Sequence, residues 1–354
     1  MRRQYSALPI ALRHDAPRLR VIACLRATTM PELKKAGEER SGKSTPAVIA
    51  MDRIVTTDRP AGSDRTSRTV RLADGRRIGY AEYGDPQGAS VLAIHGTPGS
   101  RFMFALTDKA ARERGLRIFA PERPGYGLSD FRRKDVLLQA AGDFRVFAEA
   151  VGLRRFALIG VSGGGPYAVA AAASMAERVA LLALISPVGP IAECQSKIRM
   201  SKLHRFIFTR IGRSRQSGAA FFWSLRHVVR YAPDIAYRGL MQRVAPADRS
   251  VLLRGEVKAN LQAALREGLR PGIAGARQDL RLFCTPWGLK LAEIDVPTII
   301  WQGSDDTIVP SGAAYHLAET LPNCRLDVIQ GGGHYWVFGE FHRVLDAAQA
   351  ALRA

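Results

Sequence analysis

The stretch GVSGG (160–164) places Ser162 between small residues, after the apolar run FALIG and before the helix-forming run PYAVAAAA. A serine on so tight a strand-to-helix turn takes a strained backbone conformation and projects its hydroxyl outward. The N–H groups that open the following helix point toward negative charge that develops beside the hydroxyl. The pattern therefore favours a nucleophilic serine.

The same glycines raise a second interpretation, a loop that cradles a phosphate. A phosphate loop of the GxxxxGK[ST] type needs a Lys after its glycines, and Pro166 and Tyr167 follow here instead. The dinucleotide fingerprint GxGxxG is absent from the stretch as well. The sequence therefore argues against a phosphate-binding loop.

A serine hydroxyl needs a base to activate it, and the base needs an orienting group. His334 follows the last apolar run in a GGGH loop, and Asp306 follows an earlier run in GSDDTIVP. We expect Asp306 rather than Asp305 to orient the base, since Asp305 suits a loop or helix cap. The order Ser162, Asp306, His334 is the nucleophile–acid–base order that accompanies a GxSxG turn. We predict that these three residues are catalytic.

Acyl transfer also needs two fixed N–H donors for the oxyanion. We predict that Gly163 supplies one and that Thr97, in HGTPGSR (95–101), supplies the other. Alternatively, Thr97 adds only a hydroxyl to the pocket wall. We expect His95 to shape its turn through hydrogen bonds, and His95 and Gly96 to border the substrate together with residues of the 190–290 segment that the sequence does not identify.

These residues follow short apolar runs that alternate with helical patterns, which predicts crossover units and a parallel sheet. The continuously apolar runs indicate a sheet covered on both faces, hence an α/β, doubly wound, mostly parallel sheet of about eight strands. Two alternating runs around Asp74-Gly75 predict a hairpin that precedes it. The predicted strands contain SVLAIHG (90–96), RIFAPERPG (117–125), FALIGVSGGG (156–165), VALLALISPVG (179–189), VPTIIWQGSDD (296–306) and CRLDVIQGGGH (324–334).

Three regions follow from this pattern. Residues 1–68 are basic and linker-like, and we expect them to be a largely disordered N-terminal extension, whether a targeting segment, a tail or a misassigned start. Residues 69–189 and 291–354 form the α/β core. Residues 190–290 contain amphipathic stretches and no convincing strand, which predicts an all-helical insertion placed to cover the strand ends as a cap or lid.

The net charge of +20 is concentrated outside the core. Residues 190–290 hold 19 Lys and Arg against 6 Asp and Glu. Such a surface could contact an anionic membrane weakly, but the chain lacks nucleic-acid-binding motifs, which argues against a nucleic-acid partner. With no secretory signal, no 18-residue apolar run and no CxxC pair, we expect a reduced, cytoplasmic protein. The chemistry predicted for Ser162, Asp306 and His334 implies no metal or organic cofactor. The oligomeric state is not predicted.

Five segments, HGTPGS, ERPGYGLSD, GVSGGG, GSDDTIVP and GGGH, resemble motifs of the α/β-hydrolase superfamily in order and spacing, over residues 69–354. The resemblance points to the serine-nucleophile branch with a helical cap, which includes esterases and proline iminopeptidases. It implies a structural role for ERPGYG (122–127) at the site entrance. Dehalogenases and epoxide hydrolases of this fold use an Asp nucleophile, and Ser162 stands at that position.

We therefore predict a serine hydrolase that cleaves an ester or a related acyl bond of a small molecule through an acyl-enzyme. Alternatives on the same triad are a proline iminopeptidase-like peptidase, a cofactor-free haloperoxidase and a carbon–carbon bond hydrolase. The peptidase needs cap acids to hold a substrate amine, for which Glu193, Glu256 and Glu267 are candidates. An alternative of another class is a ligand-binding protein that has lost catalysis.

Overall fold

The computed structural model describes residues 56–58, 64–132, 137–194 and 202–354, which lie in one compact unit, Asp52–Ala354. Most of the predicted N-terminal extension, residues 1–55 and 59–63, lies outside the described residues. None of the helices in the described ranges combines the length and apolarity that a membrane crossing requires.

A nine-stranded sheet runs through this unit in the order β1-β2-β3-β5-β4-β6-β7-β8-β9. The three strands at one edge, β1 to β3, pair antiparallel, and the other six pair parallel to one another. This confirms the predicted mostly parallel α/β sheet. The strands are β1 (Thr56–Asp58), β2 (Arg68–Arg71), β3 (Arg77–Gly84), β4 (Ala89–Ile94), β5 (Leu116–Pro121), β6 (Phe156–Val161), β7 (Val179–Ile185), β8 (Thr298–Gly303) and β9 (Cys324–Ile329).

The antiparallel edge begins earlier than the sequence predicts. Strands β2 and β3 form the expected hairpin, with Gly75 in the left-handed conformation at φ 85°. However, Thr56–Asp58 pairs with Thr69–Arg71 as a further strand, so ordered structure starts before Thr69. The short strand β1 pairs backbone groups of β2 that would otherwise form an open sheet edge.

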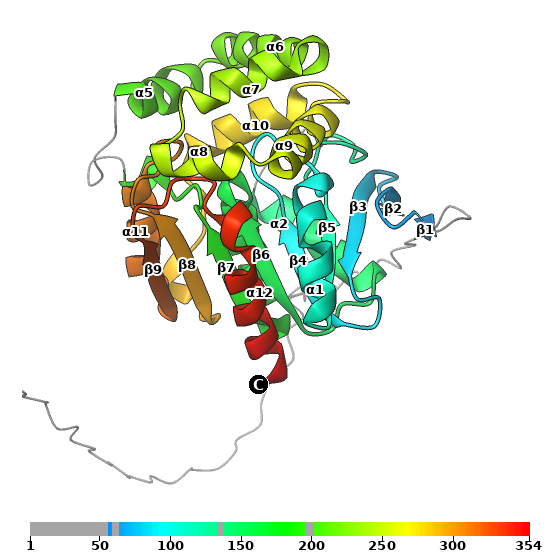
Figure 1. Cartoon of the computed structure of the whole chain (residues 1–354). Helices are drawn as coiled ribbons and strands as arrows, with labels where there is room; N and C mark the ends of the chain where they lie inside the picture. Colours follow the sequence, from blue (N-terminus) through cyan, green and yellow to red (C-terminus); the bar gives the residue numbers. More distant parts are fainter. Residues whose placement is uncertain (1–55, 59–63, 133–136, 195–201) are drawn as a thin grey trace, which may run out of the picture. The chain divides into compact units, whose positions relative to one another are not determined.

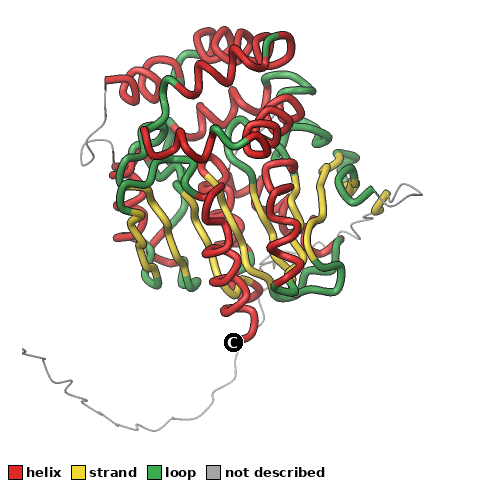
Figure 2. Tube along the Cα trace, viewed as in Figure 1, coloured by secondary structure: helices red, strands yellow, loops and turns green. Residues whose placement is uncertain are grey.

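Helices cover both faces of the sheet (Figures 1 and 2). On β4 the side chains alternate: Leu92 and Ile94 join the core beneath α2, α3 and α11, while Val91 and Ala93 join the core beneath α1 and α12. Both faces of the central strands are therefore buried, as the continuous apolar runs predict. These helices are α1 (Asp108–Glu113), α2 (Leu137–Ala150), α3 (Gly165–Ser174), α11 (Ser311–Thr320) and α12 (Val337–Arg353), with short helices η1 (Arg101–Thr107), η2 (Ser162–Gly164), η3 (Ala176–Arg178) and η5 (Leu291–Glu293).

Between β7 and β8 the chain forms a run of helices, α4 to α10, hereafter the insertion. Figure 1 shows α5 to α10 above the carboxyl ends of the strands. In the described part of residues 190–290 the secondary structure is helical and contains no strand. The helices are α4 (Ile191–Cys194), α5 (Lys202–Arg205), η4 (Phe206–Ile211), α6 (Arg215–Tyr231), α7 (Pro233–Met241), α8 (Pro246–Leu252), α9 (Gly255–Gly268) and α10 (Ala274–Phe283).

The strand order fixes where a ligand can bind. The chain moves from β4 to β5 in one direction across the sheet, then returns past β4 to β6. Connections therefore leave the neighbouring strands β4 and β6 toward opposite sides, which opens a crevice at their carboxyl ends. The predicted nucleophile turn follows β6 and the predicted oxyanion turn follows β4, so both lie at this crevice.

Candidate active site

Ser162 stands directly after β6, at the start of η2 and then α3. Its backbone has φ 51°, which places a non-glycine residue in the left-handed region, as the sequence predicts for the turn. A Cβ on Gly160 would lie 2.6 Å from the Ala168 Cβ, and one on Gly164 would lie 2.7 Å from the His95 carbonyl oxygen. Only glycine fits these two positions, because strand, turn and helix pack so closely there.

His334 follows β9 and reaches Ser162 across the crevice. Its Nε2 lies 3.0 Å from Ser162 Oγ, and its Nδ1 lies 2.7 Å from Asp306 Oδ2. The relative solvent exposure is 9% for Ser162 and 8% for His334. The structure thus brings the three predicted catalytic residues into one hydrogen-bonded chain that is largely shielded from water.

Asp306 is buried and tied down at both carboxylate oxygens. Oδ1 accepts the backbone N–H groups of Ile308 (2.8 Å) and Val309 (3.0 Å), while Oδ2 accepts the Gln302 amide (3.1 Å) and faces His334. Burial alone would raise the pKa of Asp306, but the His334 charge and these hydrogen bonds hold it below its usual range. An ionised Asp306 fixes the His334 tautomer, with the proton on Nδ1.

Asp305 does not reach the base. Its carboxylate accepts a hydrogen bond from the Ser304 hydroxyl at 2.9 Å, and its backbone N–H donates to the Gly332 carbonyl at 2.9 Å. Asp305 therefore stabilises the loops that follow β8 and β9, the loop-capping role expected for it.

The two predicted oxyanion donors lie at the same end of the crevice. Ser162 and Gly163 open η2, and the first N–H groups of a helix have no acceptor within it. A Cβ on Gly163 would lie 2.7 Å from the Thr97 Cβ and 2.8 Å from Phe283 of α10, so the turns after β4 and β6 are in close contact. The Thr97 hydroxyl itself is occupied, since it donates to Asp279 at 2.7 Å.

His95 lies beneath the turn and does not face a substrate. It is fully buried; its Nδ1 donates to the Gly96 carbonyl (2.9 Å), and its Nε2 accepts the Arg123 backbone N–H (3.2 Å). Burial, then the Arg123 charge, lowers the pKa of His95 well below its usual value, so the ring is neutral. The expected shaping role fits these contacts, but the expected substrate contact does not, because backbone groups use both ring nitrogens.

Asp279 of α10 and Arg123, which follows β5, form a buried ion pair at 2.5 Å. The same carboxylate accepts the hydroxyls of Tyr126, Tyr167 (2.7 Å) and Thr97. Arg123 also donates to the Gly96 carbonyl at 2.9 Å and to the Thr97 hydroxyl at 2.7 Å. A carboxylate of the insertion and a guanidinium of the core together hold the predicted oxyanion turn.

Asp248 of α8 holds the loop that carries His334, the predicted base. Its Oδ2 accepts the His334 backbone N–H at 2.7 Å, and its Oδ1 accepts that of Tyr335 at 2.8 Å. A Cβ on Gly333 would lie 2.5 Å from Asp248 Oδ1, so glycine is required for this approach. Burial raises the pKa of Asp248, while the two N–H groups lower it.

Sequence reasoning missed Asp248 and Asp279 as site residues. Asp248 lies in the first turn of a helix, where an acid ordinarily stabilises the helix through its dipole. Asp279 lies inside an amphipathic helix, where nothing in the sequence marks it as different from an exposed acid. A usable signal was the scarcity of acids in 190–290, since a carboxylate among 19 basic residues needs a reason to be there.

The family model, the related sequences and the similar structures all point to the same protein family. A family model described as alpha/beta hydrolase fold matches residues 89–341. A non-heme chloroperoxidase of Streptomyces lividans is 28% identical over 75% of this chain and 92% of its own length. A 2-hydroxymuconate semialdehyde hydrolase of Pseudomonas putida is 25% identical over 78% and 90%. The solved structure of an esterase from Exiguobacterium antarcticum, 19% identical, superposes with a TM-score of 0.61 over 81% of this chain and 99% of that one.

Proposed function

Because this chain belongs to the alpha/beta hydrolase fold family, we propose that it is a serine hydrolase that cleaves an ester or a related acyl bond of a small molecule. The observation that carries the proposal is the hydrogen-bonded chain from Ser162 through His334 to Asp306, with Ser162 on its strained turn. This arrangement provides a nucleophile, a base and an orienting acid.

The proposed reaction follows from these positions. Ser162 Oγ attacks the acyl carbonyl carbon as His334 Nε2 takes the hydroxyl proton, and Asp306 stabilises the resulting imidazolium. The N–H groups of Thr97 and Gly163 bind the oxyanion. His334 then gives its proton to the departing alcohol. Water, deprotonated by His334, hydrolyses the acyl-enzyme and restores Ser162.

The iminopeptidase alternative finds less support. It needs acids of the insertion to hold a substrate amine, and those near the site already bind other groups of the protein. Glu193 accepts the Trp287 backbone N–H at 2.7 Å, Glu267 pairs with Arg101 at 2.7 Å, and Glu256 lies exposed on α9. Asp248 and Asp279 are occupied as described above. Of the six acids in this segment, none that approaches the triad is available to hold a substrate amine.

Haloperoxidase and carbon–carbon bond hydrolase activities remain alternatives on the same three residues. They gain support from the names of two relatives, the chloroperoxidase and the semialdehyde hydrolase. All of these reactions require Ser162, so a substrate panel decides among them. It compares hydrolysis of p-nitrophenyl esters of increasing acyl length with monochlorodimedone bromination and with cleavage of 2-hydroxymuconate semialdehyde. A ligand-binding protein without catalysis finds no support in a site with this geometry.

The test is Ser162→Ala, which we expect to lower kcat/KM for p-nitrophenyl acetate by at least about 10³-fold, because no other group can take over as nucleophile. The matched control is Ser186→Ala. Ser186 is also a buried serine with positive φ (42°), at the end of the next strand, β7. We expect Ser186→Ala to remain active and to react with a fluorophosphonate label, and Ser162→Ala to do neither. Equal activity in wild type and Ser162→Ala would refute the assignment.

A further inference from the structure

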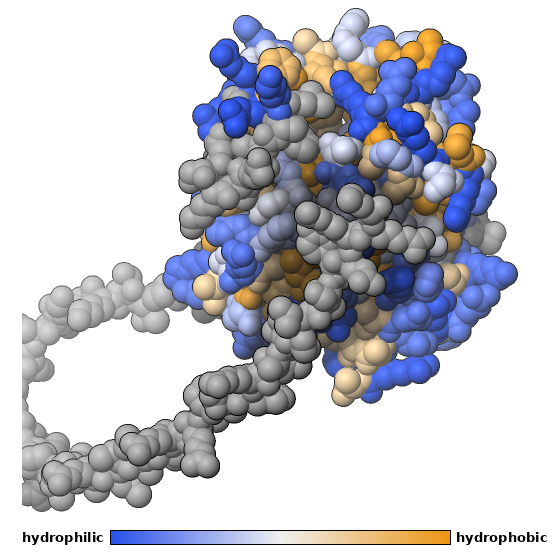
Figure 3. Space-filling view, turned by 60° about the vertical axis from the view of Figure 1, so that its left-hand side comes forward, coloured by the Kyte–Doolittle hydropathy of each residue, from blue (hydrophilic) through white to orange (hydrophobic). Residues whose placement is uncertain are grey.

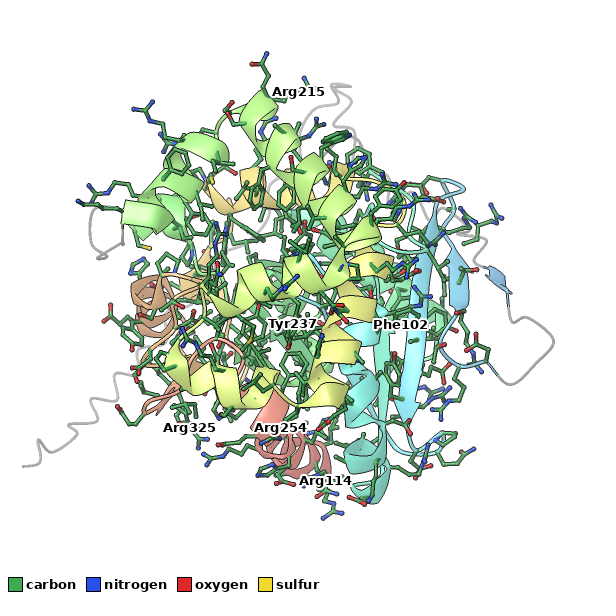
Figure 4. The ribbon with its side chains drawn as sticks, turned by 45° about the horizontal axis from the view of Figure 1, so that its top comes forward. Phe102, Arg114, Arg215, Tyr237, Arg254 and Arg325 are labelled. Carbon is green, nitrogen blue, oxygen red and sulfur yellow. The ribbon has the colours of Figure 1, made fainter. Side chains whose placement is uncertain are left out.

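A cavity lies at the insertion, apart from the triad. It has a volume of about 410 Å³ and lies between α6, α9 and Phe102 of the core. In Figure 4, Phe102 lies where the helices of the insertion meet the core. None of Ser162, Asp306 and His334 lines this cavity. Its volume is in the range of small-molecule sites.

Four arginines line the cavity, Arg226 and Arg230 from α6 and Arg266 and Arg270 from the end of α9 and the residues after it. Helical spacing of three and four residues places the lining residues of each helix on one face. The one acid in the lining, Glu267, is already paired with the buried Arg101 at 2.7 Å and with Arg270 at 3.1 Å. The lining therefore has an excess of positive charge.

The four guanidiniums differ in their partners. Arg226 donates to the Leu269 carbonyl at 2.9 Å, and Arg270 donates to the Gly127 carbonyl at 2.9 Å, so both are fixed. Among the described residues, no ion pair or hydrogen bond is formed by the side chains of Arg230 and Arg266. Arg230 lies over the Tyr231 ring. Two of the four can therefore bind an external anion without breaking an existing pair.

Apolar side chains form the rest of the lining, notably Phe102, Val229 and Leu269. Val229 and Leu269 form the base of the cavity and are almost fully buried, with 3% and 2% exposure, while Phe102 is partly exposed. A flat, solvated basic surface would not combine these groups in one hollow. Figure 3 shows hydrophilic and hydrophobic residues intermixed over the upper part of the molecule, where the insertion lies.

We propose that this cavity binds an organic anion: a phosphate or carboxylate group joined to an apolar body of about the size of one ring. Arg230 and Arg266 pair with the anionic group, because guanidinium matches the geometry of two anionic oxygens. Phe102 contacts the apolar body, which rests on the nearly buried Val229 and Leu269. The ligand is thus bound outside the triad and independently of the acyl substrate proposed above.

Phenyl phosphate is the probe, and calorimetric titration of the full chain is the measurement. We expect saturable one-to-one binding, with inorganic phosphate at least about tenfold weaker and phenol weaker still, since each lacks half of the recognised chemistry. In Arg230→Gln/Arg266→Gln we expect the Kd for phenyl phosphate to rise at least about tenfold. Hydrolysis of p-nitrophenyl acetate should be unchanged in this variant, which separates the proposal from the function of the triad.

The matched control is Arg238→Gln/Arg281→Gln, which removes the same charge from exposed arginines of α7 and α10 that do not line the cavity. We expect it to leave the Kd unchanged. An equal loss in both double variants would attribute binding to diffuse surface charge and overturn the proposal. So would the absence of saturable binding up to about 10 mM phenyl phosphate. The single variant Arg266→Gln repeats the comparison if the double variant is unstable.

Sedimentation with phosphatidylglycerol vesicles distinguishes the two sources of such an anion. The cavity is assigned to a lipid headgroup if phenyl phosphate inhibits vesicle binding and the Arg230→Gln/Arg266→Gln variant loses it. Binding of phenyl phosphate without vesicle binding assigns it to a soluble anion. Both results support the site. Vesicle binding that the variant retains and phenyl phosphate does not inhibit overturns the assignment of a lipid headgroup to the cavity.

Discussion

Strand ends and one helix of the insertion together position the residues of the candidate site. Ser162, Asp306 and His334 each follow a parallel strand, and parallel strands bring their carboxyl ends to one edge of the sheet. Asp248 reaches the His334 loop from helix α8 instead. The surroundings of His334 therefore combine a carboxylate of the core with a carboxylate of the insertion.

The proton affinity of His334 is a residue-scale property with a testable consequence. Burial would lower its pKa, but Asp306, through its charge and hydrogen bond, and then Asp248 raise it above the ordinary value of 6.5. A base must be unprotonated, so we expect kcat/KM to rise with pH through a midpoint above 6.5. Removing a negative charge near the ring destabilises its cation, so Asp248→Asn should move this midpoint to lower pH.

The measurement is the pH profile of kcat/KM for an ester substrate. The plateau of Asp248→Asn should also fall, because the two loop N–H groups bind different carboxylate oxygens and the NH2 group that replaces one of them in Asn cannot accept a hydrogen bond. The midpoint of the pH profile, however, depends on the charge of Asp248 and not on the height of the plateau. Asp234→Asn is the control, since that exposed acid pairs with Lys258 away from the base. A midpoint that stays in place or moves upward in Asp248→Asn would contradict the electrostatic account.

At the scale of elements, the fold requires glycine at some positions and accepts a larger residue at others. Gly333 approaches the Asp248 carboxylate so closely that no side chain fits. Gly142, in the middle of α2, has nothing within 4 Å of where a Cβ would stand and no left-handed φ. Gly142 therefore lowers the stability of the folded protein only through the backbone entropy that it loses in the helix.

We expect Gly142→Ala to stabilise the protein by about 0.5–1 kcal/mol, because alanine restricts the unfolded chain and favours the helix. Urea unfolding followed by circular dichroism measures the shift. Gly333→Ala is the contrasting variant and should be destabilised and slow in ester hydrolysis. A lower unfolding midpoint in Gly142→Ala would show that the helix face at this position is packed more tightly than the structure indicates.

The parallel strands and the helices between them were predictable because their apolar runs are long, continuous and separated by turns. Ser162, Asp306 and His334 were predictable as neighbours because each follows a strand of this sheet. The helical nature of the insertion was predictable from its amphipathic stretches, but the arrangement of its helices was not. The positions of Asp248 and Asp279 depend on that arrangement, so periodicity did not reveal them. The edge strand β1 was missed because three residues, Thr56–Asp58, carry no hydrophobic pattern and owe their conformation to pairing with β2.

At the scale of the whole molecule, Asp279 connects the insertion to the core. The side chains of Arg123 and Asp279 have 0% and 2% exposure, so losing one charge leaves the other buried without its partner. We expect Asp279→Asn to lower the free energy of unfolding by about 3 kcal/mol and to reduce kcat, because Arg123 and Thr97 would shift with it. Differential scanning calorimetry and ester kinetics measure the two effects.

The control again is Asp234→Asn, an exposed acid of the same insertion, for which we expect no measurable change in Tm or kcat. If Asp279→Asn kept both the stability and the kcat of the wild type, the ion pair would have no role in joining the two parts of the molecule.

The hydrogen bonds from Asp248 to the loop of His334 connect the proposed base to the insertion. A conformation in which α8 moved away from this loop would therefore also release His334. If the insertion opens and closes over Ser162 as a lid, binding and activation share one equilibrium, and an acyl compound that stabilises the covered state shifts the population toward the competent enzyme. Discrimination among substrates would thus be expressed in kcat as well as in KM, and a compound too large to be covered would meet a serine without its base.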